Sequence, residues 1–282
     1  MKILITGAKG QLGKEFVKKL EHKKKKFLAL GHAELDITDL EKIIEVFESF
    51  KPDIVINCSA YNLVDKAEKD NTPAIKVNAL GVRNLAFMCK KKGAFLVHYS
   101  TDYVFDGEKE GLYNEEDTPN PLNEYGKSKL LGEKFLREET DKYLIFRTSW
   151  VYGEGKQNFI YKLLQWTETQ EYLKIACDEF SVPTYTGRIV EITLKALEEG
   201  LTGLYHLVNS EYASRYEWAK EVFKLKGIKK FIYPVPRSYF NLPAKRPKFS
   251  AMNNEKLSRI LAIEIPPWQE DLTYFIKKCW GS

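Results

Sequence analysis

Residues 2–13 read KILITGAKGQLG, and this stretch decides the fold that the rest of the chain must adopt. The apolar run 2–6 ends at Gly7 and predicts a short buried strand. Two more glycines follow at three-residue spacing, and residues 14–20 carry apolar side chains at helical spacing. A strand, a glycine loop and a helix in this order bring backbone N–H groups and the positive end of a helix dipole together, which suits a pyrophosphate.

The glycine spacing is G-x-x-G-x-x-G, whereas the standard dinucleotide fingerprint is G-x-G-x-x-G. A plain glycine turn therefore stays open as an alternative to a nucleotide site. The second predicted strand, residues 27–30, ends at Gly31-His32-Ala33, with no acid before Glu34. Because a carboxylate there favours the ribose 2′-hydroxyl of NAD, its absence predicts that NADP(H) is accepted. His32 could help to tolerate the 2′-phosphate, or be an ordinary loop residue.

Strands and helices alternate through the first 155 residues. Further strands are expected at 53–58, 94–99 and 144–149, and helices at 38–50, 73–92 and 125–138. This alternation predicts an α/β fold with a Rossmann-like, doubly wound parallel sheet, which binds its ligands beyond the carboxyl ends of the strands. We expect one site at these ends, containing Gly7, Asp36, Ser59, Thr101 and Trp150.

Three small or polar residues, Asn78, Gly81 and Asn84, lie three positions apart on the predicted helix 73–92. Such a stripe can simply face solvent. It can also brace a neighbouring loop. The pattern does not decide between the two interpretations.

Tyr125 and Lys129 lie four residues apart in the stretch YGKSK and share one face of a predicted helix. A nearby ammonium favours a phenolate, so we expect Lys129 to lower the pKa of Tyr125. A phenol tuned in this way can exchange a proton with a carbonyl oxygen, and Thr101 offers a hydroxyl to the same oxygen. A helical surface pair beside a strand end is the alternative explanation.

Beyond Tyr152 the alternation loosens, and most prolines fall in the last 50 residues. We predict that residues 1–155 and about 186–209 form the cofactor-binding sheet domain. Residues from about 156 to 185 and from 210 to 282 are expected to form a smaller, irregular and interleaved substrate domain. A helix is expected at 158–169, a strand at 174–177, a turn at 182–184 and a helix at 215–225.

The composition is that of an ordinary globular protein: 282 residues, 44% hydrophobic, with a net charge of +5. The lysine run 23–26 predicts a solvated turn rather than a nucleic-acid surface, and a mild positive excess suits an anionic substrate. The four cysteines are widely spaced, so we expect reduced thiols and no metal site. No apolar run of membrane-spanning length or signal peptide is seen, which predicts a cytoplasmic protein without a membrane partner.

The chain resembles the extended short-chain dehydrogenase/reductase family almost from end to end. The resemblance rests on GAKGQLG (7–13), STDYVFDG (100–107), YGKSKLLGE (125–133), RTSWVYG (147–153), VPT (182–184) and AKRP (244–247). Within this family it is most similar to enzymes that act on dTDP-linked keto sugars. It departs from their pattern at Glu179 and Ser181, where they have Gln and Gly.

The resemblance implies NAD(P)H-dependent reduction of the C4 keto group of a dTDP-linked 4-dehydro-6-deoxy sugar. It implies that Tyr125 is the proton donor, that Lys129 holds the nicotinamide ribose and that Thr101 orients the carbonyl oxygen. The implied cofactor-binding residues are Gly7, Gly10, Gln11, Leu12, Gly13, Asp36, Ile37, Ser59, Ala60, Tyr61, Asn78, Tyr125 and Lys129. The implied substrate-binding residues are Thr101, Asp102, Trp150 and Arg246, the last as a bidentate contact to the diphosphate.

The expected cofactor is NADP(H), with NAD(H) as the alternative, and the expected partners are the dTDP-sugar and a second copy of the chain in a homodimer. A related sugar-nucleotide epimerase or reductase is the rival enzyme. A cofactor-binding regulatory subunit, like the beta subunit of methionine adenosyltransferase, is the rival from another class. The presence of Thr101, Tyr125, Lys129 and Trp150 together favours a working active site.

Overall fold

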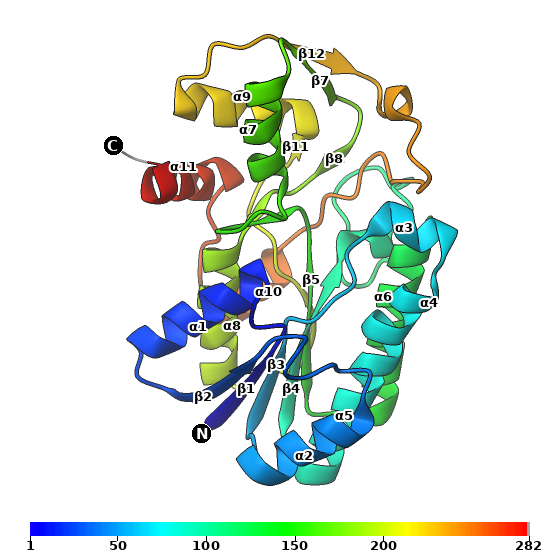
Figure 1. Ribbon diagram of the computed structural model, residues 1–282, viewed down its shortest axis with the longest axis vertical. Helices are drawn as coiled ribbons and strands as arrows, with labels where there is room; N and C mark the ends of the chain where they lie inside the picture. The colour runs from blue at the N-terminus through cyan, green and yellow to red at the C-terminus, as the bar shows by residue number, and fades with distance from the viewer. Residues whose placement is uncertain (281–282) are drawn as a thin grey trace.

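A six-stranded parallel sheet forms the centre of the computed structural model, which describes residues 1–280 (Figure 1). The strand order is β10-β5-β4-β3-β1-β2, and every neighbouring pair is parallel. The strands are β1 (Lys2–Thr6), β2 (Lys26–Leu30), β3 (Ile54–Asn57), β4 (Phe95–Thr101), β5 (Tyr143–Thr148) and β10 (Gly203–His206). The predicted α/β, doubly wound class is confirmed.

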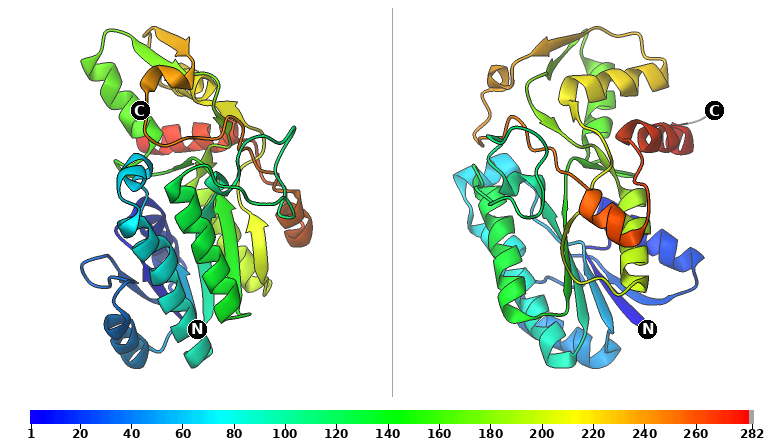
Figure 2. Two further views of the ribbon diagram at one scale, coloured as in Figure 1. Left: turned by 90° about the vertical axis from the view of Figure 1, so that its right-hand side faces the viewer. Right: turned by 180° about the vertical axis from the view of Figure 1, so that it is seen from behind.

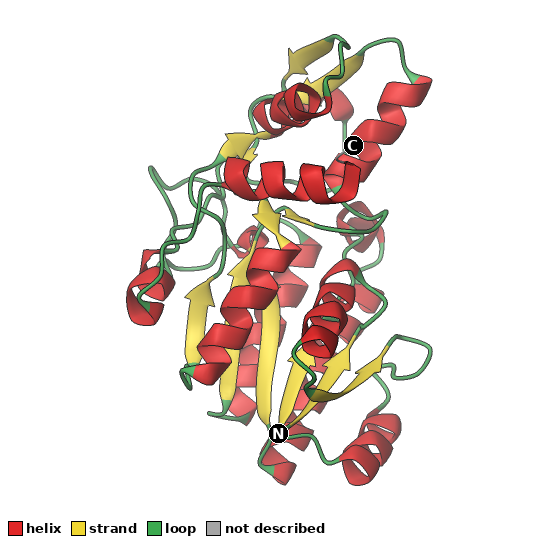
Figure 3. Cartoon of the chain, turned by 90° about the vertical axis from the view of Figure 1, so that its left-hand side faces the viewer, coloured by secondary structure: helices red, strands yellow, loops and turns green. Residues whose placement is uncertain are grey.

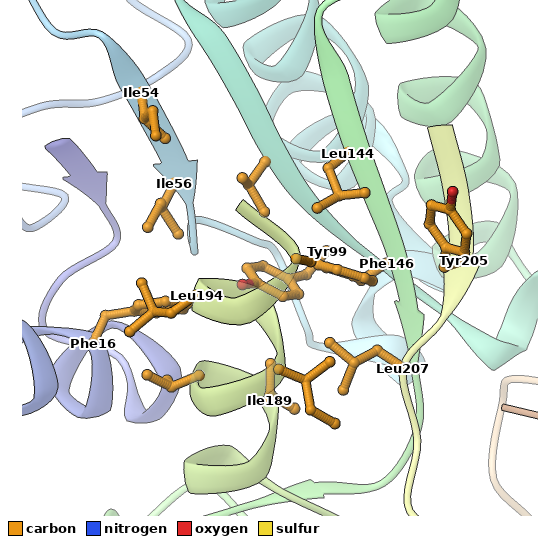
Figure 4. Close-up of a cluster of buried hydrophobic side chains, with 14 of the residues drawn as sticks. Phe16, Ile54, Ile56, Tyr99, Leu144, Phe146, Ile189, Leu194, Tyr205 and Leu207 are labelled. Carbon is orange, nitrogen blue, oxygen red and sulfur yellow. The ribbon is translucent and has the colours of Figure 1, made fainter. Parts of the chain in front are cut away.

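Helices cover both faces of the sheet (Figure 3). One face packs against α1 (Gln11–His22), α8 (Thr186–Glu198) and α10 (Glu255–Leu261), and Figure 4 shows the apolar side chains between these layers. The other face packs against α2 (Leu40–Phe50), α5 (Gly81–Lys92) and α6 (Glu124–Glu139). Because both faces are buried, the central strands are nearly continuous apolar runs, which is why they were recognisable in the sequence.

The order in which the chain adds strands to the sheet reverses direction between β1 and β3. The chain leaves β1 for β2 on one side and returns to β3 on the other, which makes this crevice the topological switch point of the sheet. Gly7, with φ +62°, follows β1, and a Cβ at this position would lie 2.7 Å from the backbone of Cys58. Glycine at position 7 therefore lets the two strand ends come close together.

The helix expected over 73–92 is divided. After α3 (Val64–Lys69), the chain forms α4 (Thr72–Ile75), a π-helical turn η1 (Lys76–Leu80) and then α5. A Cβ on Gly132 of α6 would lie 2.0 Å from the carbonyl oxygen of Asn78, so the glycine allows α6 to press against the turn. Single π turns are frequent at functional sites, and this one places Asn78 between the loop at Tyr61 and helix α6.

The second domain lies over the carboxyl end of the sheet (Figures 1 and 2). Its helices are α7 (Phe159–Thr169), α9 (Arg215–Lys226) and α11 (Trp268–Trp280). Its short strands are β6 (Val151–Tyr152), β7 (Leu173–Ala176), β8 (Phe180–Ser181), β9 (Thr184–Tyr185), β11 (Ala213–Ser214) and β12 (Ile232–Val235). Its separate core is built around Tyr152, Trp218 and Phe275.

The chain returns to the sheet with α8 and β10, as the sequence predicted. The tail is more regular than we expected, because α11 begins directly after Pro266 and Pro267, where a helix tolerates proline. The short helix α10 also packs on the sheet domain. The domain boundaries stay predictions.

Two further expectations concern the chain as a whole. Within residues 1–280, no helix is both long and apolar enough to cross a membrane. The four cysteines are free thiols.

Candidate active site

The first turn of α1 is open to a ligand. No side chain caps this helix, whereas Asp39, Asn123, Asn158 and Ser214 cap α2, α6, α7 and α9. A Cβ on Gly13 would lie 2.5 Å from the carbonyl oxygen of Gly7, so the loop folds tightly below the helix. Backbone N–H groups of Gln11, Leu12 and Gly13 in such a turn suit an anionic phosphate. The residues present therefore fit the pyrophosphate of a dinucleotide.

The loop that contains Asp36 and Ile37 is held by α5. The Asn84 side chain donates to the carbonyl oxygen of Ile37 at 3.2 Å, and a Cβ on Gly81 would lie 2.6 Å from the Ile37 side chain. Asp36 accepts hydrogen bonds from the backbone and the hydroxyl of Thr38, both at 2.9 Å. For Asn84, the bracing interpretation of the polar stripe is confirmed.

Asn78 braces a second loop, Ser59–Tyr61. Its side chain exchanges hydrogen bonds with the Tyr61 backbone at 2.9 and 3.0 Å and donates to Ser128 at 3.0 Å. It is fully buried, so its amide serves to place Tyr61 beyond the end of β3. A contact between Asn78 and the cofactor stays a prediction, as do those of Ser59, Ala60 and Tyr61.

A carboxylate does stand at the end of β2. Glu34 folds back, accepts a hydrogen bond from the Gly31 N–H at 3.0 Å and pairs with Lys9 of the glycine loop. The lysine hydrogen bond lowers the pKa of Glu34. The expectation that no acid stands at this strand end is wrong, because a turn that folds back leaves no signal in residue spacing.

Tyr125 lies in the first turn of α6, directly beyond the end of β4. Asn123 caps this turn by accepting the Gly126 N–H at 2.8 Å, and a Cβ on Gly126 would lie 2.2 Å from the Tyr103 carbonyl oxygen. Burial raises the pKa of Tyr125 to about 12; a Thr101 hydrogen bond lowers it, and the Asp102 charge raises it. Thr101 and Tyr125 are thus brought together, as the sequence predicted.

The expectation that Lys129 lowers the pKa of Tyr125 is wrong for this state. The Lys129 ammonium is 2% exposed and points to β4, where Nζ donates to the Tyr99 carbonyl oxygen at 2.5 Å and lies 3.4 Å from His98 Nε2. Burial lowers the pKa of Lys129 itself to about 8, and Glu133 opposes this effect. Of Tyr125 and Lys129, the lysine is therefore the group whose protonation changes closer to neutral pH.

The substrate side contains a buried carboxylate. Asp102, in the short helix η2 (Asp102–Val104), accepts hydrogen bonds from Thr101 at 3.1 Å, Ser181 at 2.8 Å and Ser250 at 2.6 Å. Burial raises the pKa of Asp102 to about 6 despite the three hydroxyls. Asp102 thereby ties β4 to two segments of the second domain.

Trp150 follows β5 with φ +40°, an unusual conformation for a large residue and one that costs free energy. The Arg215 guanidinium lies 3.5 Å from the centroid of its ring, and Trp218 stacks on it with centroids 5.6 Å apart. Arg215 also lies 3.8 Å from Glu179. The indole is therefore fixed in place by packing from the second domain.

Arg246 reaches the sheet domain from a proline-flanked loop. Its guanidinium forms a bidentate ion pair with Asp65 of α3, at 2.7 and 3.1 Å, while Asn123 donates to the Lys245 carbonyl oxygen at 2.8 Å. In this state Arg246 ties the loop down. Its contact with a substrate diphosphate stays a prediction.

Several residues of the site escaped the sequence analysis. Glu179 and Ser181 had a signal, since both depart from the family pattern. Asp102, the partner of Ser181, was named from the resemblance, but Arg215, the partner of Glu179, was not. Asn57 and His98 were hidden inside apolar strands. Among residues 1–280, no three His, Cys, Asp or Glu side chains gather closely enough to hold a metal ion.

A glycine loop at the switch point, with a threonine, a tyrosine and a lysine around the end of β4, defines a class of protein: the extended short-chain dehydrogenases/reductases. The family model described as "RmlD substrate binding domain" matches residues 1–280. The chain is 37% identical over 286 residues to dTDP-4-dehydrorhamnose reductase of Burkholderia thailandensis, covering 95% of this chain and 96% of the relative.

Two solved structures are similar over nearly their whole length. A dTDP-4-dehydrorhamnose reductase from Clostridium acetobutylicum is 39% identical, with a TM-score of 0.95 over 99% of both chains. The enzyme from Bacillus anthracis in complex with NADP is 36% identical, with a TM-score of 0.95 over 98% of this chain and 99% of that one. The chain belongs to the dTDP-4-dehydrorhamnose reductase family.

Proposed function

We propose that this chain catalyses the NAD(P)H-dependent reduction of dTDP-4-dehydro-L-rhamnose to dTDP-L-rhamnose. The observation that carries the proposal is the meeting of Thr101, Tyr125 and Lys129 around the end of β4, beside a glycine loop suited to a dinucleotide. Several relatives that match nearly the whole chain are named dTDP-4-dehydrorhamnose reductase, and the structure of one of them is a complex with NADP.

The cofactor would lie across the switch point, with its pyrophosphate on residues 10–13 and its adenine near Asp36 and Ile37. The nicotinamide supplies the hydride. The protein supplies position and charge: Thr101 orients the keto oxygen, and Tyr125 gives that oxygen its proton. Because the pKa of Tyr125 is about 12, the phenol carries its proton throughout the working range of pH.

Lys129 acts together with Thr101 and Tyr125. Its ammonium lies one helical turn from Tyr125, where it would hold the nicotinamide ribose, the role that the resemblance implies. On the substrate side, Trp150 packs against the sugar and Asp102 holds Thr101. Arg246, once released from Asp65, would meet the diphosphate as a planar, bidentate donor.

The direct test combines the purified chain with dTDP-4-dehydro-L-rhamnose and NADPH, without any other protein. We expect oxidation of the nicotinamide, measured by absorbance, to match formation of dTDP-L-rhamnose, measured by NMR. A matched reaction with a UDP-linked keto sugar tests whether the enzyme requires the dTDP nucleotide. Formation of a 4-epimer without net oxidation would favour the epimerase alternative instead.

The rival from another class is a cofactor-binding regulatory subunit. Such a protein would bind NADPH and leave the keto sugar unreduced unless a partner enzyme were present. Titration of NADPH followed by a single-turnover assay on the same sample separates the two. Assembly into a homodimer and a cytoplasmic location stay predictions from the sequence.

A further inference from the structure

A row of buried polar side chains continues from Lys129 into the sheet, and the mechanism above assigns it no role. His98, fully buried in β4, lies between Asn57 of β3 and Lys129 of α6. The Asn57 Nδ2 to His98 Nδ1 distance is 3.1 Å, and the Lys129 Nζ to His98 Nε2 distance is 3.4 Å. Each imidazole nitrogen therefore faces one neighbour.

The orientation of the Asn57 amide is fixed by its other contacts. Its Oδ1 accepts the backbone N–H of Ser59 at 3.1 Å and the hydroxyl of Thr6 at 2.7 Å. A backbone N–H can only donate, so the oxygen of Asn57 must face it, and the NH₂ group must face His98. The amide NH₂ also can only donate. His98 Nδ1 is therefore the acceptor, and the neutral ring carries its proton on Nε2.

This tautomer has a consequence for Lys129. The Nε2–H of His98 points at Nζ, and an ammonium has no lone pair with which to accept it. The amine form of Lys129 has one, and it can still donate to the Tyr99 carbonyl oxygen. The contact is thus a hydrogen bond only when Lys129 has lost its proton.

We propose that His98 is a positioning residue whose fixed Nε2–H donor favours the amine form of Lys129 and so sets the pH at which Lys129 loses its proton. The catalytic meaning of this inference rests on the proposed reductase function. A lysine that changes protonation near working pH can take part in the reprotonation of Tyr125.

Other groups around Lys129 act differently. On α6, Glu133 raises its pKa, but this carboxylate is already held by Arg147 of β5 at 2.8 and 3.0 Å. Tyr125 on the same helix is a neutral phenol. Asp102 of η2 acts on Tyr125, as described above. The neighbouring amides, Asn57 of β3 and Asn78 of η1, carry no charge.

Two variants separate the two sides of the imidazole. His98→Asn keeps an amide near the position of Nδ1, so Asn57 retains an acceptor while Lys129 loses its neighbour. His98→Gln places an amide NH₂ near the position of Nε2 and retains a donor for Lys129. Lys129→Met serves to assign the Lys129 signal.

The first measurement needs no substrate. In ¹⁵N spectra of the wild-type protein, His98 should show a protonated Nε2 and an unprotonated Nδ1 between pH 6 and 9. In ¹³Cε lysine spectra, His98→Asn should raise the pKa of Lys129 by about one unit or more, and His98→Gln should keep it near the wild-type value. An Nδ1–H tautomer, or a Lys129 pKa unchanged in His98→Asn, would overturn the inference.

The second measurement is the pH dependence of kcat with the keto sugar and NADPH. The alkaline fall in kcat should move to higher pH in His98→Asn and stay in place in His98→Gln, with KM for the sugar and Kd for NADPH unchanged in both. Equal alkaline limbs in wild type and His98→Asn would contradict the inference. A wild-type protein that fails to reduce the sugar would refute the proposed function and leave the spectroscopic result standing.

Discussion

The cofactor side and the substrate side of this site are built by different means. The cofactor side uses glycines, backbone N–H groups and neutral amides, and its residues follow the ends of β1 and β3. The substrate side uses charged groups from distant segments, including the pairs Arg246 with Asp65 and Arg215 with Glu179. The cofactor side thus depends mainly on backbone geometry, and the substrate side depends mainly on charge.

This difference separates two kinds of sensitivity. A geometric site fails when a backbone is displaced, and it depends little on pH or salt. A charged site assembled from two domains depends on the protonation of its members and on competition between ion pairs. Tyr125 and Lys129 lie on the boundary between the two, and variants there should have the largest effects.

The largest effect is expected from Tyr125→Phe, which keeps the ring and removes the proposed proton donor. General acid catalysis typically contributes 10²–10⁴-fold, so kcat should fall by about that factor. The Kd for NADPH, measured by fluorescence titration, should stay near the wild-type value because the cofactor side is untouched. Turnover close to wild type would remove Tyr125 from the mechanism.

The second prediction concerns the folding free energy that is lost because Lys129 is buried. Lowering the pKa of Lys129 from 10.5 to about 8 costs up to about 3 kcal/mol at pH 7, because the unfolded chain binds a proton that the folded chain holds less tightly. Lys129→Met should therefore abolish reduction and raise the free energy of unfolding by about 1–3 kcal/mol at pH 7.

The pH dependence provides the control for this variant. A depressed lysine pKa penalises the folded state fully below pH 8, and the penalty disappears as the pH rises from 8 towards 10.5. The difference in stability between Lys129→Met and wild type, measured by urea unfolding, should shrink over that range. A difference independent of pH would show that packing, rather than charge, is responsible.

The same contrast explains how far the sequence could be interpreted. The central strands and α6 were predicted nearly to their bounds, since buried apolar runs and glycines are local signals. The short helix α3 was missed because VDKAEK has no apolar period. Asp102 and Ser250 are 148 residues apart, and Asp65 and Arg246 are 181 apart. No local sequence pattern could therefore predict either contact.

The third prediction tests the charged side through a matched pair. Arg246→Ala removes the guanidinium, and Asp65→Asn removes the partner that holds it. If Arg246 meets the diphosphate, Arg246→Ala should raise KM for the dTDP-sugar by about 10–100-fold, roughly the loss of one or two charge-assisted hydrogen bonds. Asp65→Asn should lower KM or leave it unchanged, because the guanidinium is then free.

The alternative is that Arg246 only ties down its loop. Both variants would then lose thermal stability to a similar extent, with KM unchanged or raised equally. An equal loss of affinity for NADPH and the sugar nucleotide in Arg246→Ala would place the arginine on the cofactor side and refute its assignment. Kinetics and thermal unfolding of the two proteins, measured in one buffer, distinguish these outcomes.

The smallest expected effect lies on the cofactor side, at an exposed ion pair. Glu34 holds Lys9 beside the end of β2, where the 2′-phosphate of NADP would lie. Both side chains are exposed, so the pair is weak, and Glu34→Gln should lower the Kd for NADPH only about threefold. The Kd for NADH should stay constant or rise, because the glutamine keeps no charge for the ribose hydroxyl. Lys9→Met is the matched control and should weaken NADPH alone. A parallel change for both cofactors in Glu34→Gln would mean that the loop has moved, so that geometry governs this contact as well.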